Sequence, residues 1–257
     1  MLKNMFSLEG KVAMVSGASS GLGERFATVL AAHGAKLVCV GRRMDALTAV
    51  AGRISDSGGQ ALAVSADVTD PEAVRLAFDT AEEEFGTVDI LVNCAGIQSM
   101  AGVLEMSDEQ FTSVMDINVS GLWRVAKECA VRLVKAKKQG SIINIASILG
   151  LQARAESSNY CTSKAAVLHM TKSLALDLMP HGIRVNAMAP GYFETELTRW
   201  WLDSEEGQLA KSRLPVGRFG DLEELDGPLL LLASDASSYM SGSVLTIDAA
   251  HSVSILQ

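Results

Sequence analysis

The stretch "SGASSGLG", residues 16–23, carries three glycines, Gly17, Gly21 and Gly23, in the pattern G-x-x-x-G-x-G. It stands between a short apolar run and an amphipathic stretch that stops at Gly34, so the sequence predicts a strand, a tight turn and a helix. Glycine lets the backbone turn sharply and lets a pyrophosphate approach without a Cβ in the way, and the start of a helix offers free N–H groups. An ordinary βα turn can also be rich in glycine, but at the first turn of an alternating chain the pattern indicates nucleotide binding.

Strand-like and helix-like stretches alternate from this turn to the end of the chain. The expected strands are continuous apolar runs between helices, which is typical of a parallel sheet covered on both faces. They span residues 11–16, 35–41, 61–67, 88–96, 141–147, 183–190 and 243–248, and one long helix is expected over about 108–138. With no linker and no repeat, the sequence predicts an α/β fold: a single-domain, Rossmann-type, doubly wound parallel sheet of about seven strands over residues 1–257. Residues 192–214 are expected to form a substrate-binding lid inserted into this domain.

The composition excludes several classes of protein. The 257-residue chain has a formal net charge of −8, which argues against a general nucleic-acid binder, since that class presents a basic face. No apolar stretch approaches the roughly 20 residues of a membrane helix, and no signal peptide is visible. The four cysteines form no C-x-x-C pair and are typical of reduced thiols, so a cytoplasmic location is expected. The four histidines lack the spacing of metal ligands, and no catalytic metal is expected.

The end of the second expected strand bears on the choice of cofactor. NAD-binding domains commonly place an acidic residue there to hold the ribose 2′-hydroxyl. This chain has Arg42 and Arg43 instead, and guanidinium groups match a 2′-phosphate. Both arginines could simply be solvated, and Asp45 fits the first turn of the next helix. The sequence therefore favours NADP, with NAD as the alternative.

A tyrosine and a lysine in "NYCTSK", residues 159–164, suggest acid–base chemistry. Tyr160 and Lys164 are four residues apart and share one face of an expected helix. A free tyrosine has a pKa of about 10, and a nearby ammonium group favours the phenolate. Ser147 ends the fifth expected strand, at the edge of the sheet where ligands bind in open parallel folds. Taken alone, the pair could equally be a half-buried tyrosine beside a surface lysine.

These motifs together resemble the short-chain dehydrogenases/reductases, and the resemblance covers nearly the whole chain. It rests on "GASSGLG", "NCAG" (residues 93–96), Asn118 in "MDINVSG", the serine, tyrosine and lysine above, and "PGYFET" (residues 190–195). The resemblance implies an NAD(P)-dependent oxidoreductase, a carbonyl reductase or alcohol dehydrogenase that interconverts a ketone and a secondary alcohol by hydride transfer. It also implies a homotetramer or dimer.

The same resemblance implies a role for each catalytic residue. Tyr160 would be the general acid/base, and Lys164 would lower the pKa of Tyr160 and hold the nicotinamide ribose. Ser147 would orient and polarise the carbonyl group. Asn118 would anchor a water that links Lys164 to bulk solvent, although a helix-interior amide bonding its own backbone is an alternative.

The resemblance further implies which residues contact the cofactor. Asp67 would meet the adenine, unless it is only a turn residue, and Thr195 would hold the carboxamide, unless it caps a helix. The full expected set is Gly17, Ser19, Ser20, Gly21, Leu22, Gly23, Arg42, Arg43, Asp67, Val68, Asn93, Ala95, Gly96, Tyr160, Lys164, Pro190, Gly191, Phe193 and Thr195. The chain departs from the family pattern at Ser20, which is not basic, at Cys94, where an asparagine is frequent, and at Ala249 and Ala250, where glycines are frequent.

Substrate contacts are expected from loops at the same edge of the sheet, namely from Ser147, Leu149, Tyr160, Tyr192, Trp200 and Trp201. The two tryptophans would form an apolar lid or pack on a neighbouring helix or subunit. Arg154 could receive a carboxylate, but a solvated arginine is the favoured interpretation. Two alternatives to a small-molecule carbonyl reductase remain: a 3-oxoacyl-thioester reductase whose carrier protein meets the lysines of residues 135–138, and a non-enzymatic nucleotide sensor. No nucleic acid or membrane partner is expected.

Overall fold

The computed structural model describes residues 5–195 and 198–254, so small parts of the expected domain (1–257) and lid (192–214) lie outside it. Seven parallel strands form one sheet in the order β3-β2-β1-β4-β5-β6-β7. They are β1 Val12–Ser16, β2 Lys36–Gly41, β3 Gln60–Ser65, β4 Ile90–Asn93, β5 Gly140–Ile145, β6 Ile183–Pro190 and β7 Val244–Ile247. The expected Rossmann-type sheet is thereby confirmed.

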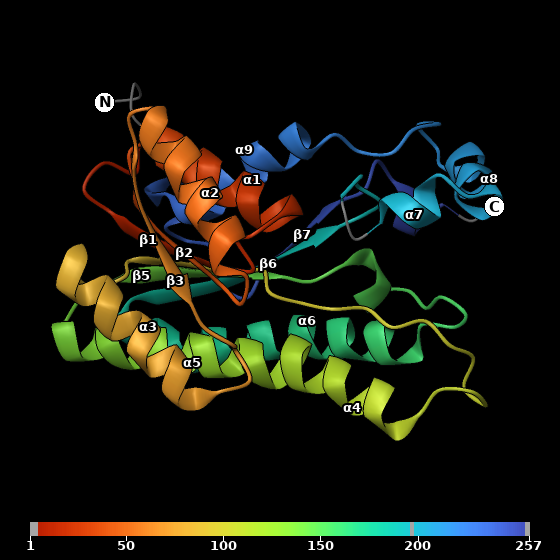
Figure 1. Ribbon diagram of the computed structural model, residues 1–257, viewed down its shortest axis with the longest axis horizontal. Coiled ribbons are helices and arrows are strands. Elements are labelled where there is room, and N and C mark those ends of the chain that lie inside the picture. The colour runs from red at the N-terminus through yellow and green to blue at the C-terminus, as the bar shows by residue number, and fades with distance from the viewer. Residues whose placement is uncertain (1–4, 196–197, 255–257) are drawn as a thin grey trace.

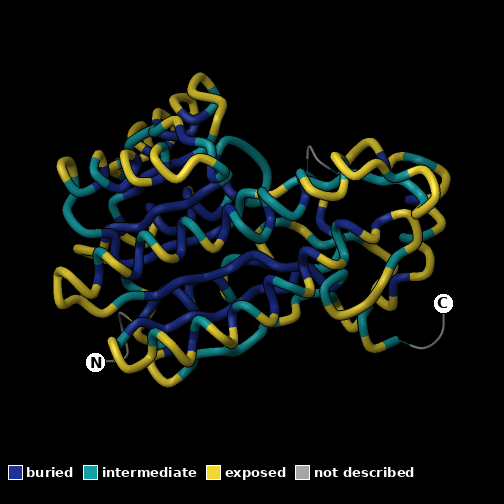
Figure 2. Tube along the Cα trace, turned by 90° about the horizontal axis from the view of Figure 1, so that it is seen from below, coloured by how far each residue is buried: buried dark blue, intermediate teal, exposed yellow. Residues whose placement is uncertain are grey.

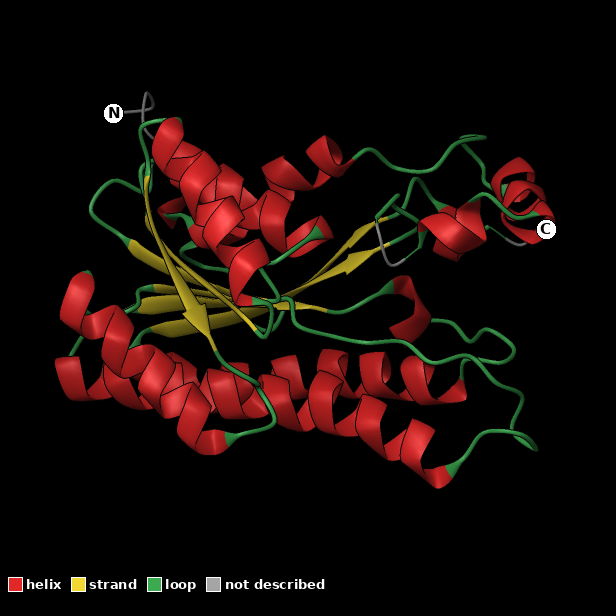
Figure 3. Cartoon of the chain, viewed as in Figure 1, coloured by secondary structure: helices red, strands yellow, loops and turns green. Residues whose placement is uncertain are grey.

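Helices cover both faces of this sheet (Figure 1). One layer holds α1 Gly21–Ala32, α2 Met44–Asp56 and α9 Asp226–Ala233, and the other holds α3 Pro71–Glu84, α4 Asp108–Met115, α5 Leu122–Ala136 and α6 Ser158–Leu178. Two short helices, α7 Arg199–Leu202 and α8 Glu205–Arg213, lie apart from both layers at one end of the molecule (Figure 3). They fall within the segment expected to be a lid.

The long helix expected over residues 108–138 is present but interrupted. Ser107 begins α4 with a reciprocal capping box to Gln110. A π-helix, Asp116–Gly121, then separates α4 from α5. Such single-turn π insertions are frequent at functional sites. This one contains Asn118.

The core explains why the strands read as unbroken apolar runs. Successive residues of one strand enter different clusters: Val15 packs with the α1, α2 and α9 side, and Met14 packs with the α3, α5 and α6 side. Both faces are therefore dry, and the central strands form the buried middle of the molecule (Figure 2).

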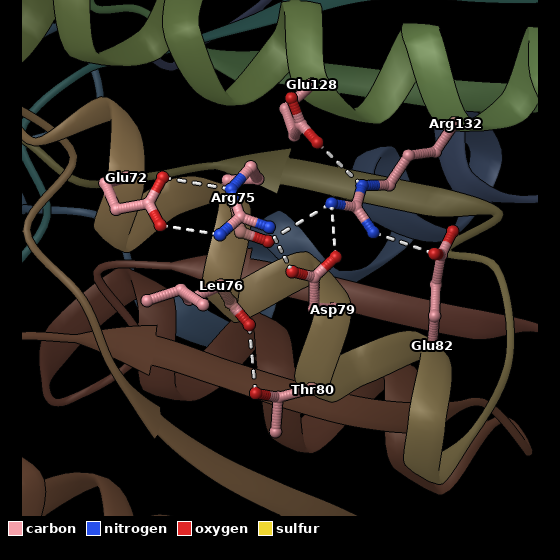
Figure 4. Close-up of polar contacts among 8 residues, drawn as sticks. All are labelled: Glu72, Arg75, Leu76, Asp79, Thr80, Glu82, Glu128 and Arg132. Carbon is pink, nitrogen blue, oxygen red and sulfur yellow. Dashed lines mark hydrogen bonds and ion pairs between the residues drawn. The ribbon is translucent and has the colours of Figure 1, made fainter.

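A network of ion pairs ties α3 to α5 on the surface (Figure 4). The Arg132 guanidinium donates to Asp79 at 2.8 Å, to Glu82 at 2.7 Å and to Glu128 at 2.7 Å. Arg75 shares Asp79 and also pairs with Glu72. Because networks hold geometry better than isolated exposed pairs, this one holds α3, which precedes β4, against α5, which follows the π-helix.

Parallel strands place all their carboxyl ends at one edge of the sheet. At this edge β1 enters the glycine-rich turn, β4 enters the segment from Cys94, and β5 leads to Ser147. The order of the strands reverses between β1 and β4, which is the position where doubly wound sheets bind ligands. In the described residues, no helix is both long and apolar enough to cross a membrane.

Candidate active site

A cavity of about 410 Å³ opens at this edge of the sheet. It contains three of the four expected catalytic residues and all expected cofactor-contacting residues except Asn93. Its lining is Gly17, Ser19, Ser20, Gly21, Leu22, Gly23, Gly41, Arg42, Arg43, Ala66, Asp67, Val68, Cys94, Ala95, Gly96, Ile97, Ile117, Ile145, Ala146, Ser147, Tyr160, Lys164, Pro190, Gly191, Tyr192, Phe193, Thr195 and Thr198. Asn118, Leu149, Trp200 and Trp201 are outside this lining.

The glycine-rich turn fits a phosphate-bearing cofactor. Gly17 and Gly21 have φ angles of +73° and +57°, which side chains rarely adopt. A Cβ at Gly17 would stand 2.8 Å from the backbone of Ala95. A Cβ at Gly23 would collide with the carbonyl of Gly17, 2.7 Å from its carbon. Glycine at these positions therefore allows the close backbone approaches that bring the N–H groups at the start of α1 to the cavity.

Arg43 stands beside this turn. Its Nη2 donates to the Ser20 hydroxyl at 2.7 Å and to the Ser19 hydroxyl at 3.1 Å. The cluster of one guanidinium group and two hydroxyl groups offers several hydrogen-bond donors to an anion. Among the described side chains, no carboxylate is paired with Arg43. Arg42 lies 3.8 Å from Asp67 across the same part of the cavity. This donor set suits a ribose 2′-phosphate.

Two of the expected polar contacts have additional structural duties. Asp67 accepts hydrogen bonds from the Thr69 amide and hydroxyl, so it closes a turn as well as lining the cavity. Burial alone would raise the pKa of Asp67, but these bonds and Arg42 together hold that pKa below its usual range. The Asn93 side chain turns into the core and donates to Asn144 of β5 at 3.0 Å. Asn93 therefore braces two strands.

Tyr160 and Lys164 share a face of α6, as their spacing predicts. The Lys164 ammonium lies 5.5 Å from the centroid of the Tyr160 ring and donates to the Ile145 carbonyl at 2.8 Å. Ser147 hydrogen-bonds Tyr160, and its hydroxyl also accepts from the Leu149 amide at 3.1 Å. The serine, tyrosine and lysine thus meet at one wall of the cavity.

The electrostatics of this pair differ from the sequence expectation. Burial raises the pKa of Tyr160 to about 12, and the hydrogen bond from Ser147 offsets only part of that rise. Burial also lowers the pKa of Lys164 to about 8. The expectation that Lys164 lowers the tyrosine pKa fails within the protein alone, because desolvation opposes the charged form of both groups. Tyr160 therefore holds its proton at neutral pH.

We expect Lys164→Met to raise the free energy of unfolding at pH 7 by about 1–3 kcal/mol. The folded pKa of Lys164 is about 8, below the 10.5 of a free lysine, so burying the charged form opposes folding at pH 7. As pH rises from 8 toward 10.5 this cost disappears, wild-type stability rises, and the difference between the two proteins should shrink. Denaturant unfolding across pH 6–10 measures it. Lys172→Met, an exposed change on the same helix, is the control; a destabilised Lys164→Met protein at pH 7 would contradict the argument.

Asn118 is nearly inaccessible and acts on the backbone that borders the cavity. Its Oδ1 accepts from the Ile97 amide at 2.9 Å, and its Nδ2 donates to the Ile97 carbonyl at 2.9 Å. The same Nδ2 donates to the Ser163 hydroxyl at 3.0 Å, next to Lys164. The alternative that Asn118 bonds its own helix backbone is therefore wrong.

Thr195 is not the cap of a helix, because the N-cap of α7 is Thr198. Thr195 lines the cavity beside Gly21, whose Cβ would lie 3.4 Å from the threonine side chain. Its amide donates to the Thr198 hydroxyl at 3.0 Å, and its carbonyl accepts from the Arg199 amide at the start of α7. Sequence reasoning missed Thr198, which the T-x-x-T spacing of residues 195–198 could have indicated.

The two tryptophans, which lie outside the cavity lining, differ in exposure. Trp201 is buried and stacks on Tyr192 with ring centroids 5.2 Å apart, whereas Trp200 is 65% exposed. Tyr192 also meets Phe219 and His251 edge-on. Arg154 is half-buried against this cluster, which differs from the solvated arginine that the sequence favoured. A single arginine in a loop belongs to no sequence pattern that predicts its burial.

Sequence comparisons find relatives over nearly the whole chain. Residues 17–250 match a family model described as enoyl-(acyl carrier protein) reductase. The gluconate 5-dehydrogenase of Gluconobacter oxydans is 38% identical over 253 residues, 98% of each chain. The 3-oxoacyl-[acyl-carrier-protein] reductase FabG of Vibrio cholerae is 36% identical over 243 residues, 94% of this chain and 97% of the relative.

Solved structures are similar over the same length. A short-chain type dehydrogenase/reductase from Mycobacterium marinum is 43% identical, with a TM-score of 0.92 over 96% of this chain and 98% of the other. A gluconate 5-dehydrogenase from Burkholderia cenocepacia, in complex with NADP and tartrate, is 35% identical with a TM-score of 0.94 over 98% of this chain and 99% of the other.

Proposed function

Because this chain belongs to the short-chain dehydrogenase/reductase family, and is therefore an NAD(P)-dependent oxidoreductase, we propose that NADP(H) and Tyr160 together interconvert a ketone and a secondary alcohol in the cavity described above. One observation carries the proposal. The buried hydroxyl of Tyr160 stands beside Ser147 in the same cavity as the glycine-rich turn.

The lining fits NADP along its whole length. The α1 N-terminus and the glycine-rich turn suit the pyrophosphate, and Arg43 with Ser19 and Ser20 suits the 2′-phosphate. Lys164 would hold the nicotinamide ribose, and Thr195 the carboxamide. Bound NADPH supplies the hydride that adds to the carbonyl carbon, and NADP⁺ accepts it in the reverse direction.

The chain itself handles the proton. In reduction, Tyr160 would give its phenolic proton to the carbonyl oxygen, and Ser147 would hold that oxygen by a hydrogen bond. A proton from solvent then restores Tyr160, so one NADPH and one proton are consumed for each alcohol formed. The raised pKa of Tyr160 keeps this acid loaded at neutral pH. In oxidation the same hydroxyl must first lose its proton.

Asn118 would be a positioning residue in this scheme. Its two bonds to Ile97 fix the backbone that borders the cavity, and its bond to Ser163 fixes α6 one residue before Lys164. The π-helix around Asn118 brings its amide to this position. An ordered water between Asn118 and Lys164 would complete the route for the proton.

The first experiment is NADPH and NADH oxidation against a panel of ketones and acetoacetyl thioesters. Turnover with any member supports the oxidoreductase reaction, and the panel ranks its substrates. Tight NADPH binding with no turnover of any carbonyl would instead support the alternative of a nucleotide sensor.

Arg43→Ala should raise the KM for NADPH by about 10- to 100-fold and leave the KM for NADH nearly unchanged. A charge-assisted hydrogen bond to a phosphate contributes about 1.5–3 kcal/mol to binding. NADH has no 2′-phosphate, so its binding does not depend on this bond. Steady-state kinetics with both cofactors measure the effect. Arg53→Ala is the matched control, because Arg53 is an exposed arginine already paired with Glu24. Equal losses with NADPH and NADH would count against NADP as the preferred cofactor.

A 3-oxoacyl-thioester reductase is the second candidate, favoured by the similarity to FabG proteins. The basic residues 135–138 do not support a carrier-protein site, however. They lie at the C-terminal end of α5 and in the turn before β5, whereas Ser147 follows the other end of that strand. Six residues of strand separate the two edges by about 20 Å. Thioester turnover that is insensitive to Lys135→Glu would be the expected result for this candidate.

We further propose that residues 192–214, of which 196 and 197 lie outside the described part, form a lid over the substrate, with Tyr192, Trp200 and Trp201 on its inner side and Leu149 facing them.

An assembly of four chains is also proposed. Exposed apolar side chains on α4 and α5, namely Phe111, Trp123, Val131 and Val134, would meet at one interface, and the exposed edge strand β7 with α9 at another. Light scattering checks this, and a monomer at micromolar concentration would contradict it.

A further inference from the structure

Arg154 is held in place by neutral groups. Its guanidinium lies over the ring of Trp201, with the central carbon 4.5 Å from the ring centroid. Its Nη2 lies 3.8 Å from the sulfur of Met100, and it hydrogen-bonds the Tyr192 hydroxyl. Stacking on an aromatic ring leaves the edge of a guanidinium group free to donate two parallel hydrogen bonds.

This cation has no carboxylate partner within residues 5–195 and 198–254. Most arginines of the chain do pair with a carboxylate there: Arg25, Arg42, Arg53, Arg75, Arg124, Arg132, Arg199 and Arg218. The chain has 30 acidic residues and a net charge of −8, so acids are plentiful. A half-buried arginine without an anion in such a chain is a site that an external anion would neutralise.

The position of Arg154 connects it to the reaction. It lies in the loop between Ser147 and α6, the helix that carries Tyr160. Its partner Tyr192 lines the cavity together with Ser147 and Tyr160. Arg154 thus stands one side chain, that of Tyr192, away from the lining that holds Ser147 and Tyr160.

We propose that Arg154 binds the carboxylate of the substrate, so that the substrate is a keto acid, or the corresponding hydroxy acid, with an apolar segment between its two functional groups. This inference rests on the function proposed above. The walls near Arg154 are Trp201, Met100 and the Tyr192–Phe219 pair, which offer apolar surface to the chain of the substrate. A polyhydroxylated acid would leave its hydroxyl groups against these side chains without partners.

The test measures binding apart from turnover. Methyl ketones that end in a carboxylate after two to five methylene groups, and their methyl esters, are titrated by calorimetry into NADP⁺-saturated protein, which cannot reduce them. We expect the best-fitting acid to bind wild type at least ten-fold more tightly than its ester. Arg154→Gln should weaken binding of the acid by about 10- to 100-fold, the range of a charge-assisted hydrogen bond. Binding of the ester should not change. Arg154→Lys should recover part of the loss.

Arg199→Gln is the matched control, since it removes one positive charge from α7 but from an arginine that already pairs with Glu194. The inference is overturned if acids and esters bind wild type equally, or if Arg199→Gln weakens the acids as much as Arg154→Gln. Tighter binding of 5-ketogluconate than of every methyl-ketone acid would overturn the inference that the substrate has an apolar segment between its two functional groups. Failure of the proposed function would give a different result from failure of this inference. No ketone would oxidise NADPH, while acid binding would still depend on Arg154.

Discussion

Tyr160→Phe is expected to lower kcat for ketone reduction by about 10³- to 10⁴-fold, which corresponds to about 4–5.5 kcal/mol in the activation free energy. The variant removes one oxygen atom, the only part of the side chain that can give a proton to the substrate. The affinity for NADPH should change by less than about three-fold, because the ring and its contact with Lys164 remain. Single-turnover kinetics with saturating NADPH separate the chemical step from binding.

Tyr239→Phe serves as the control for this change, because Tyr239 is fully exposed and is not part of the cavity lining. Its kcat should equal that of wild type. Rates within ten-fold of each other for wild type and Tyr160→Phe would remove Tyr160 from the role of general acid. The catalytic group would then have to be sought elsewhere in the cavity.

The fold was predictable because its determinants are local and repeated. A strand such as β1 is an apolar run whose alternate residues enter opposite clusters, and that pattern predicts a parallel sheet. The glycine-rich turn was predictable because positive φ angles at Gly17 and Gly21 are conformations that few other residues tolerate. The interruption of the helix at Asn118 was not, since a π-helix depends on tertiary contacts with Ile97 and Ser163.

The candidate site was predictable in membership but less so in its energetics. The spacing of Tyr160 and Lys164 gives their shared face, but the direction of their pKa shifts depends on burial, which the sequence does not reveal. The same limit applies to Trp200 and Trp201, adjacent residues with opposite exposure. It also applies to Arg154, whose environment comes from Met100, Tyr192 and Trp201, all distant from it along the chain.

Buried charge at this site has a consequence for how stability and activity are related. Lys164 is held at a cost in its charged form, and Arg154 is half-buried without a carboxylate among the described side chains. Both costs fall when anionic or polar ligands bind, so ligand binding should stabilise the protein beyond what contact area alone gives. In the Arg132 network on the surface of α3 and α5, by contrast, the guanidinium is already paired with carboxylates.

Gly23→Ala is expected to have the largest structural effect of any single methyl group in the site. The added Cβ would overlap the carbonyl oxygen of Gly17 and lie 2.7 Å from its carbon, and both atoms belong to backbone that cannot rotate away. The turn must therefore open, which should lower the free energy of unfolding by about 3 kcal/mol or more. It should also weaken NADPH binding by at least about 100-fold, because the N–H groups at the start of α1 move off the phosphates.

Gly52→Ala is the control that isolates this mechanism from the general effect of replacing glycine in a helix. Gly52 lies within α2, and its added Cβ would meet nothing within 4 Å. Alanine has the higher helix propensity, so this variant should gain about 0.5–1 kcal/mol in stability and bind NADPH normally. Thermal unfolding with and without NADPH measures both. If Gly23→Ala kept wild-type affinity for NADPH, the glycine-rich turn would not be the element that approaches the pyrophosphate, and the orientation of the cofactor in the cavity would have to be reversed.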